Sequence, residues 1–210
     1  ILRYLHFLSA KRDQNGLIGF GLGDWCQPAR PANTPKAPQV VTDSILSMDM
    51  AYKAAFLLEV IHMPLERDFA EALAKSLRES IRKHLVDFSA FCVKGNCQTS
   101  QAMAIFYGVF TKTEAVNGFQ QLLKFIHAED EHMDTGILGA RVLFHVLSEF
   151  GYSNLAYRMI TRTDFPSYGN WIVRGATSLW EEFQPENAVV TSRNHHFFGD
   201  VSHWMIKQIA

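Results

Sequence analysis

The sequence predicts an all-α protein whose helical hairpins form an α/α toroid, with an inner and an outer ring of helices. Three pairs of helical segments follow one another, and in each pair the first segment is apolar on nearly every side while the second has a polar face. No segment of useful length shows the period of two that is typical of a half-buried strand. The alternative is a solenoid of helix pairs, but the sequence shows no repeat at a fixed period of about 34 to 47 residues.

The first pair covers residues 43–63 and 66–87. Apolar side chains, among them Phe56 and Leu57, surround the first segment, so we expect a buried inner helix that ends before Pro64. The second segment has apolar residues at steps of four and basic residues opposite them, which predicts an outer helix. The apolar positions are Phe69, Leu73, Leu77, Ile81 and Leu85, and the basic face carries Arg67, Arg78 and Arg82.

The second and third pairs repeat this alternation. Residues 101–110 and 137–150 are mostly apolar and are predicted as inner helices. Thr113 is the expected N-cap of the amphipathic helix that follows the first of them, and Ser153 is the expected N-cap of the short helix that follows the second.

The chemically distinctive residues gather in the connections that lead from each outer helix to the next inner one. These connections are G-L-G-D-W-C at 21–26, G-N-C-Q-T-S at 95–100, E-H-M-D-T-G at 131–136 and the run 165–182. The opposite connections, at 62–64, 111–112 and 151–152, are short. In a toroid all connections of one kind lie at one end, so we expect the distinctive residues at one mouth of the barrel.

Composition excludes several classes of function. The 210 residues are 48% hydrophobic and 20% charged with a net charge of −1, so no basic surface for nucleic acid is predicted. No apolar run reaches the roughly 18 residues that a membrane span needs. The three cysteines, Cys26, Cys92 and Cys97, match no zinc spacing, and the sequence predicts neither a metal site nor another cofactor.

Residues 175–183, G-A-T-S-L-W-E-E-F, and 194–199, N-H-H-F-F-G, resemble a specific pattern. It is the pattern of the C-terminal part of the catalytic domain in bacterial α-L-rhamnosidases of glycoside hydrolase family 78. The resemblance implies an (α/α)6-barrel of about twelve helices, of which residues 1–210 would form a partial barrel of about eight. The N-terminal helices of the catalytic domain and the flanking β-modules would lie outside this chain, and that remainder is its expected partner.

Glu181 is the leading catalytic candidate. A carboxylate beside Trp180 is partly desolvated, which suits a general base, although the spacing alone favours a structural cap or ion pair. The resemblance implies that Glu181 activates water in an inverting hydrolysis, while Glu182 stands at a variable position. By the same resemblance His195 contacts the sugar next to the cleaved bond, a role that a neutral imidazole can fill because it both donates and accepts hydrogen bonds.

Five further residues are candidates for sugar binding. Asp24 and Trp25 resemble a glycine-aspartate-tryptophan element of the family, and the alternative is a plain turn with a buried tryptophan. Trp171 and Trp180 are either sugar platforms or core residues. His132 lies in the connection 131–136, at the same predicted end, where Asp134 can instead cap the next helix.

The resemblance therefore implies an enzyme that removes terminal α-L-rhamnosyl residues from a rhamnose-containing carbohydrate. Glycoside hydrolysis needs two carboxyl groups, and the family's general acid lies in an acidic segment that precedes the equivalent of Asp24 and has no match here. The isolated chain is accordingly expected to be inactive. The first alternative is a non-catalytic helical carbohydrate-binding or interaction domain, and a weaker one is another α/α-toroid glycosidase or a polysaccharide lyase.

Overall fold

The computed structural model describes residues 1–31, 33–188 and 192–209. The described residues form nine helices and one small antiparallel hairpin, so the predicted all-α class is confirmed. The helices are α1 (Leu2–Ala10), α2 (Gln39–Val60), α3 (Pro64–Leu85), α4 (Gln98–Phe106), α5 (Lys112–Ala128), α6 (Ile137–Glu149), α7 (Ser153–Thr161), α8 (Tyr168–Val173) and α9 (Asp200–Ile209). The strands are β1 (Val86–Asp87) and β2 (Cys92–Val93), in which Val86 pairs with Val93.

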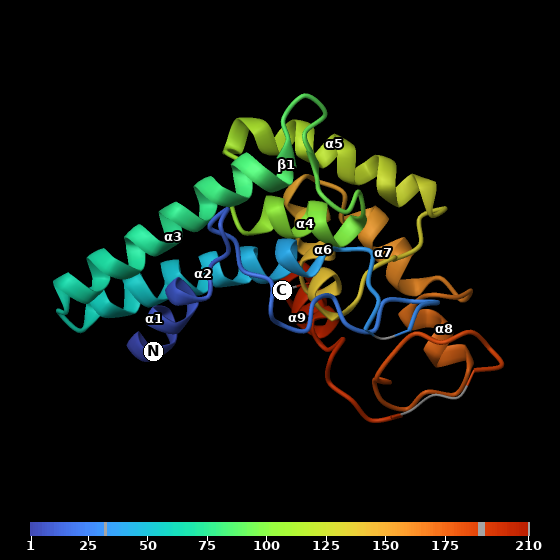
Figure 1. The fold of residues 1–210 in the computed structure, drawn as a ribbon. Coiled ribbons are helices and arrows are strands. Elements are labelled where there is room, and N and C mark those ends of the chain that lie inside the picture. The colour runs from blue at the N-terminus through green and yellow to red at the C-terminus, as the bar shows by residue number, and fades with distance from the viewer. Residues whose placement is uncertain (32, 189–191, 210) are drawn as a thin grey trace.

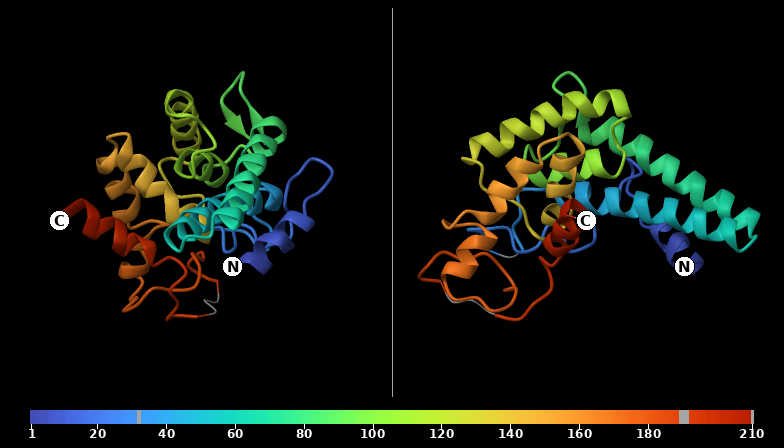
Figure 2. Two further views of the ribbon diagram at one scale, coloured as in Figure 1. Left: turned by 90° about the vertical axis from the view of Figure 1, so that its left-hand side faces the viewer. Right: turned by 180° about the vertical axis from the view of Figure 1, so that it is seen from behind.

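Three helical hairpins, α2–α3, α4–α5 and α6–α7, form the body of the molecule (Figure 1). Their first helices are neighbours in the order α2, α4, α6, and α9 packs beside α6. Viewed along α2 and α3, the hairpins follow one another as an open arc (Figure 2, left). This arrangement is the α/α toroid that the alternation of apolar and amphipathic segments predicts.

Burial separates the inner from the outer helices. In α4 every side chain from Gln98 to Ile105 is buried, and in α6 the buried residues are Gly139, Ala140 and the run 142–147. In α3 Leu73 and Leu77 are buried on one face, as predicted for an outer helix. A helix that is buried on most sides needs neighbours on most sides, which only the inner positions provide.

The inner helix α2 is the exception, because its C-terminal end is exposed. Phe56 is 68% exposed and Leu57 is 48% exposed, so the prediction that these two side chains are buried is wrong. The two long helices α2 and α3 extend together beyond the other helices, and α4 covers only the opposite end of α2 (Figures 1 and 2). Apolarity on all sides therefore identified α2 as an inner helix. It did not show how much of its length other helices of this chain cover.

The basic face of α3 is not wholly solvated. Arg78 and Arg82 are half-buried, and both donate hydrogen bonds to the backbone carbonyl of Val109, at 3.0 and 2.8 Å. Arg82 also forms a bidentate pair with Glu114, at 2.7 and 2.8 Å. Hydrogen bonding to Arg82 is the largest of several causes that lower the pKa of Glu114 to about 2. These contacts fix the connection between α4 and α5 against the outer helix.

The helix α5 begins earlier than the sequence predicts. Its N-cap is Thr111, whose hydroxyl accepts a hydrogen bond from the backbone N–H of Glu114, while the Glu114 carboxylate accepts one from the backbone N–H of Thr111. The predicted cap at Thr113 is therefore wrong. The reciprocal pair needs a hydroxyl three residues before the glutamate, and that spacing selects Thr111.

Among the described residues, no helix combines the length and the apolar character needed to cross a membrane.

Candidate functional site

The predicted mouth of the barrel is organised around the carboxylate of Asp24. This side chain has no exposed surface. One oxygen accepts hydrogen bonds from the Thr99 hydroxyl and from the backbone N–H of Gly136, at 2.7 Å for the latter. The other oxygen accepts from the backbone N–H groups of Leu138 and Gly139, at 2.9 and 3.0 Å. Burial raises the pKa of Asp24, while the hydrogen bond from Thr99 and those from the backbone lower it.

These bonds make Asp24 the N-terminal cap of α6, supplied by a connection more than 110 residues away in the sequence. The N-terminal N–H groups of a helix lack intrahelical partners, and a carboxylate satisfies them while interacting favourably with the helix dipole. The N-cap position itself is Gly136, where a Cβ would lie 2.2 Å from the backbone oxygen of Asp24. A direct contact between Asp24 and a sugar stays a prediction, and this geometry does not favour it.

Trp25 is held at the same place but keeps exposed surface. Its backbone carbonyl accepts a hydrogen bond from the N–H of Ile137 at 2.9 Å, and its side chain packs against the core while remaining half-buried. The backbone is therefore fixed at the start of α6, and part of the indole is available to a ligand.

A second group of polar contacts joins the same connections. The Gln27 amide donates to the carboxylate of Asp134 at 2.6 Å, and Lys36 forms ion pairs with both Asp134 and Glu129, the latter at 2.8 Å. Gln98 binds the backbone of residues 132 and 134 at 2.9 and 3.0 Å. The possible cap at Asp134 is thus not used, because Asp24 caps α6 from another loop.

His132 connects this group to the segment after α7. Its Nδ1 lies 3.1 Å from the carbonyl oxygen of Glu129, and its Nε2 lies 3.0 Å from a carboxylate oxygen of Asp164. Hydrogen bonds from Arg162, followed by those from His132, hold the pKa of Asp164 well below its usual range. His132 lines a cavity of about 280 Å³ together with Pro28, Ala29, Glu129, Met133, Asp134, Phe165 and Pro166.

Glu181 and His195 lie on two segments that run side by side. The N–H of Glu181 donates to the carbonyl of Ser192 at 3.0 Å, and the N–H of His195 donates to the carbonyl of Leu179 at 2.8 Å. The hydroxyl of Ser178 donates to the carbonyl of Arg193. This pairing holds the two predicted site residues on neighbouring segments, and they are 14 residues apart in the sequence.

The charge of Glu181 acts on Cys26, which lies in the loop that carries Asp24. Burial first, and then the charges of Glu182, Glu181 and Asp24, raise the pKa of Cys26 to about 12. The thiol is therefore protonated and inert at neutral pH. Together with the hydrogen bonds from Thr99 and Gly136 to Asp24, this coupling brings the four distinctive connections to one end of the helices (Figure 1).

The two tryptophans after α7 are core residues in this structure. Trp171 is 2% exposed and stacks on Phe183 with ring centres 4.1 Å apart, and the buried Trp180 contacts the guanidinium groups of Arg174 and Arg193, 5.2 and 5.5 Å from its ring centre. The cluster anchors the segment that carries Glu181. Their predicted role as sugar platforms stays a prediction that burial does not favour.

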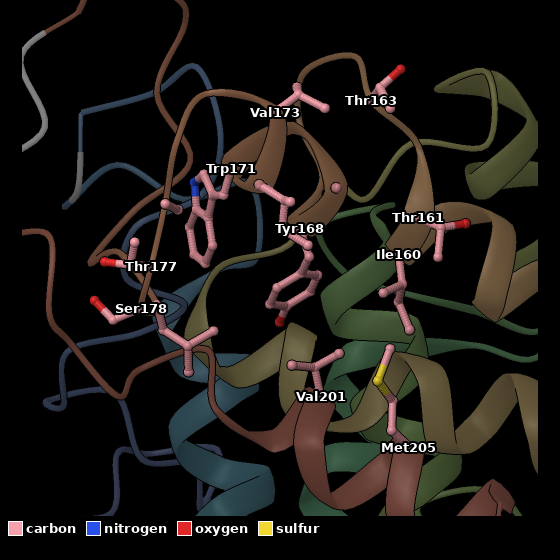
Figure 3. Close-up of a pocket in the computed structure, with 14 residues that line it drawn as sticks. Ile160, Thr161, Thr163, Tyr168, Trp171, Val173, Thr177, Ser178, Val201 and Met205 are labelled. Carbon is pink, nitrogen blue, oxygen red and sulfur yellow. The ribbon is translucent and has the colours of Figure 1, made fainter.

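Trp171 also lines an apolar cavity of about 540 Å³ beside Tyr168, Val201 and Met205 (Figure 3). Neither this cavity nor the smaller one at His132 is lined by Glu181 or His195. The structure thus brings Asp24, Trp25, Glu181 and His195 to one end of the fold, whereas Trp171 and His132 face separate cavities. Lys36 and Asp164 belong to this end as well, and no sequence pattern marked them.

Comparison with known proteins gives one consistent result. Residues 1–209 match the family described as the bacterial α-L-rhamnosidase 6 hairpin glycosidase domain. The chain is 28% identical over 220 residues to an α-L-rhamnosidase of Alteromonas sp. (strain LOR), covering 97% of this chain and 23% of that protein. It is 29% identical over 218 residues to an α-L-rhamnosidase of Streptomyces avermitilis, covering 100% of this chain and 20% of that protein.

Solved structures show the same relationship. The crystal structure of Streptomyces avermitilis α-L-rhamnosidase complexed with L-rhamnose superimposes with a TM-score of 0.85 at 27% identity, covering 96% of this chain and 20% of that chain. The structure of α-L-rhamnosidase from Dictyoglumus thermophilum has a TM-score of 0.88 at 24% identity, which shows a shared fold. The chain spans about a fifth of the length of the curated relatives it matches. Because the family match extends over residues 1–209, this chain belongs to the bacterial α-L-rhamnosidase six-hairpin glycosidase family.

Proposed function

We propose that the complete protein hydrolyses terminal α-L-rhamnosyl residues from glycosides or polysaccharides, and that this chain supplies the general base, Glu181. The observation that carries the proposal is the position of Glu181 within the family fold. Its segment pairs with the segment of His195, and its charge reaches the loop of Asp24 and Trp25. These are the elements that the family pattern associates with the site.

The division of labour follows from the chemistry of each group. As a carboxylate, Glu181 takes a proton from a water molecule that attacks the anomeric carbon with inversion. The half-buried Trp25 offers an indole face to the apolar side of the sugar ring, and His195 binds its hydroxyls. A second carboxyl group, about 6.5–9.5 Å from the first in an inverting enzyme, protonates the leaving oxygen and comes from the preceding part of the catalytic domain. Asp24 acts indirectly, by holding Trp25 against α6.

The test is Glu181→Gln in the full-length protein, assayed on an aryl α-L-rhamnoside. Loss of a general base typically reduces the rate by about 10²–10⁴, so kcat should fall by that factor while the circular dichroism spectrum is unchanged. Glu186→Gln is the matched control, because Glu186 is an exposed glutamate on the same segment. Proton NMR of the first product formed should show the inverted anomer.

Each other outcome has a defined meaning. If Glu181→Gln keeps near-wild-type kcat, Glu181 is not the base. If the wild-type full-length protein binds rhamnosides without any turnover, the chain belongs to a non-catalytic carbohydrate-binding domain. If the wild-type enzyme releases the retained anomer, the inverting mechanism is wrong.

A further inference from the structure

We propose that His145, Asp200 and His203 form a binding site for a divalent transition metal such as Zn²⁺ between α6 and α9, independent of the proposed hydrolysis. The Nε2 atom of His145 lies 2.8 Å from one carboxylate oxygen of Asp200. The Nδ1 atom of His203 lies 3.7 Å from the other oxygen. One donor atom from each residue lies within 4.8 Å of the other two.

The fold brings these three side chains together through helix packing. Asp200 is the first residue of α9, and His203 follows three positions later, so both project from the same face of that helix. His145 lies in the middle of α6, which packs against α9. The rings of His145 and His203 have centres 5.0 Å apart. Because 55 residues separate His145 from Asp200, no local spacing in the sequence reveals the cluster, and the cysteines alone predict no metal site.

The donor set matches the preferences of zinc. Zn²⁺ binds imidazole nitrogen at about 2.0–2.1 Å and carboxylate oxygen at about 2.0–2.2 Å, so tetrahedral ligand atoms lie about 3.4 Å apart. The separations of 2.8 and 3.7 Å, each to a different oxygen of Asp200, bracket that value, and all three donor atoms lie within 4.8 Å of one another. Three protein ligands leave one position open for water or for a group from another part of the protein. Ca²⁺ and Mg²⁺ prefer oxygen ligands, and two imidazoles therefore select against both.

The alternative explanation is a hydrogen bond that ties α9 to α6. It accounts for His145, which is 5% exposed and would otherwise lack a partner for its ring nitrogen at this face. It gives no bond to His203, whose 67% exposed side chain lies near the same carboxylate through the i, i+3 spacing of α9 at a separation longer than a hydrogen bond. A cation between the three groups would use both imidazoles as ligands.

The other charged groups near the site have opposite signs, so their effects on a bound cation partly cancel. Burial raises the pKa of the neighbouring Tyr107, Arg141 lowers it, and Asp49 and Asp200 raise it further. One guanidinium and a second carboxylate therefore face the same region, and Asp49 is itself paired with Lys53 at 2.6 Å. The attraction for a cation consequently depends on direct ligation by the imidazoles and not on a general excess of negative charge.

The experiment is calorimetric titration of the metal-free full-length protein with Zn²⁺. We expect saturable binding of one Zn²⁺ per chain at this site, no binding of Ca²⁺ or Mg²⁺ at the same concentrations, and visible absorption when Co²⁺ replaces Zn²⁺. His203→Ala is the main variant because its side chain is exposed and its loss leaves the core intact. Removal of a group that only supports a ligand typically costs 10–100-fold in metal affinity, so loss of His203 itself should weaken binding by at least about tenfold.

Two controls keep the result interpretable. His84→Ala removes an exposed histidine of α3 and should leave the Zn²⁺ affinity unchanged. Asp200→Asn preserves the shape of the side chain and should weaken binding about as much as His203→Ala. Zn²⁺ should raise the melting temperature of the wild type more than that of either site variant, because a ligand that binds the folded state stabilises it. The absence of saturable Zn²⁺ binding, or equal affinity in His203→Ala and His84→Ala, would overturn the proposal and leave the cluster as a hydrogen bond between two helices.

Discussion

The two ends of the helical hairpins are closed in different ways. At one end, the turns after α2, α4 and α6 each use the same local motif: the N–H groups of Met63, Val109 and Tyr152 donate to the carbonyl five residues earlier, at 2.9, 2.9 and 2.8 Å. At the other end, side chains bridge connections that are far apart in sequence. Asp24 binds Thr99 across 75 residues and Leu138 across 114, and Gln27 binds Asp134 across 107.

This difference between the two ends separates the contacts that stabilise the hairpins from those that position the candidate site. A local turn is formed mainly by its own backbone, although the carbonyl oxygen of Val109 also accepts hydrogen bonds from two arginine side chains of α3. A network of buried side chains instead places several loops relative to one another, which a binding site requires. The predicted site residues Trp25, Glu181 and His195 all lie at the end closed by long-range bonds. Changes at the two ends should therefore have different consequences.

The largest expected effect is that of Asp24→Ala. The substitution leaves the Thr99 hydroxyl and the N–H groups of Gly136, Leu138 and Gly139 without their acceptor in a buried site. Hydrogen bonds to a charged group contribute about 1.5–3 kcal/mol each when one partner is removed, so we expect unfolding to become at least about 3 kcal/mol easier. Urea unfolding measures the change, and activity should fall as well because the start of α6, which binds the Trp25 carbonyl, loses its cap.

Asp13→Ala is the matched control for this prediction. Asp13 is exposed, lies in the same connection as Asp24, and accepts hydrogen bonds from the N–H groups of Asn15 and Leu17, at 2.8 and 2.9 Å. Its bonds are local, and the carboxylate itself is exposed, so its loss should cost about 1 kcal/mol. Equal losses for the two variants would show that the long-range network contributes no more than an ordinary turn.

The sequence predicted the hairpins well because periodicity is a local property. The inner character of α4 and α6 and the buried face of α3 follow from apolar spacing within each segment. The exposure of Phe56 and Leu57 did not follow, because it depends on how far α2 extends beyond its neighbours. The cap at Thr111 could have been predicted from the sequence, since the spacing of three residues to Glu114 is that of the reciprocal capping pair.

The sequence predicted which residues belong to the candidate site better than it predicted what each of them does. The family pattern selected Asp24, and their aromatic character made Trp171 and Trp180 candidates, but neither signal distinguishes a residue that contacts a sugar from one that is buried beneath the site. The structure makes the distinction, since Asp24 caps α6 and both tryptophans lie in an aromatic cluster. The sequence placed the connection 95–100 at this end, but the hydrogen bond from Thr99 to Asp24 carries no signal in a single sequence, because nothing near Thr99 requires that contact.

An intermediate effect is expected for His195→Ala, which removes a polar contact at the functional end. A lost hydrogen bond to a buried partner costs about 1–3 kcal/mol, and where it serves the ground state and the transition state alike it raises KM, here roughly tenfold, with little change in kcat. The measurement is steady-state kinetics of the full-length enzyme on an aryl rhamnoside. His196→Ala is the control, because His196 is the exposed neighbour that the family pattern does not match. Similar KM values for the two variants would exclude a specific role for His195.

The smallest effects are expected at the local turns, where stability should change and catalysis should not. Each turn needs a residue with positive φ, and the residues there are His62 (φ 58), Gly108 (φ 72) and Gly151 (φ 82). An added Cβ at Gly151 meets nothing within 4 Å, so Gly151→Ala tests backbone strain alone and should cost about 1 kcal/mol in thermal unfolding. At the equivalent position, His62→Gly relieves the same strain and should stabilise the protein by about 0.5 kcal/mol. Both variants should keep the wild-type kcat and KM, and a change in either constant would show that the two ends of the hairpins are coupled.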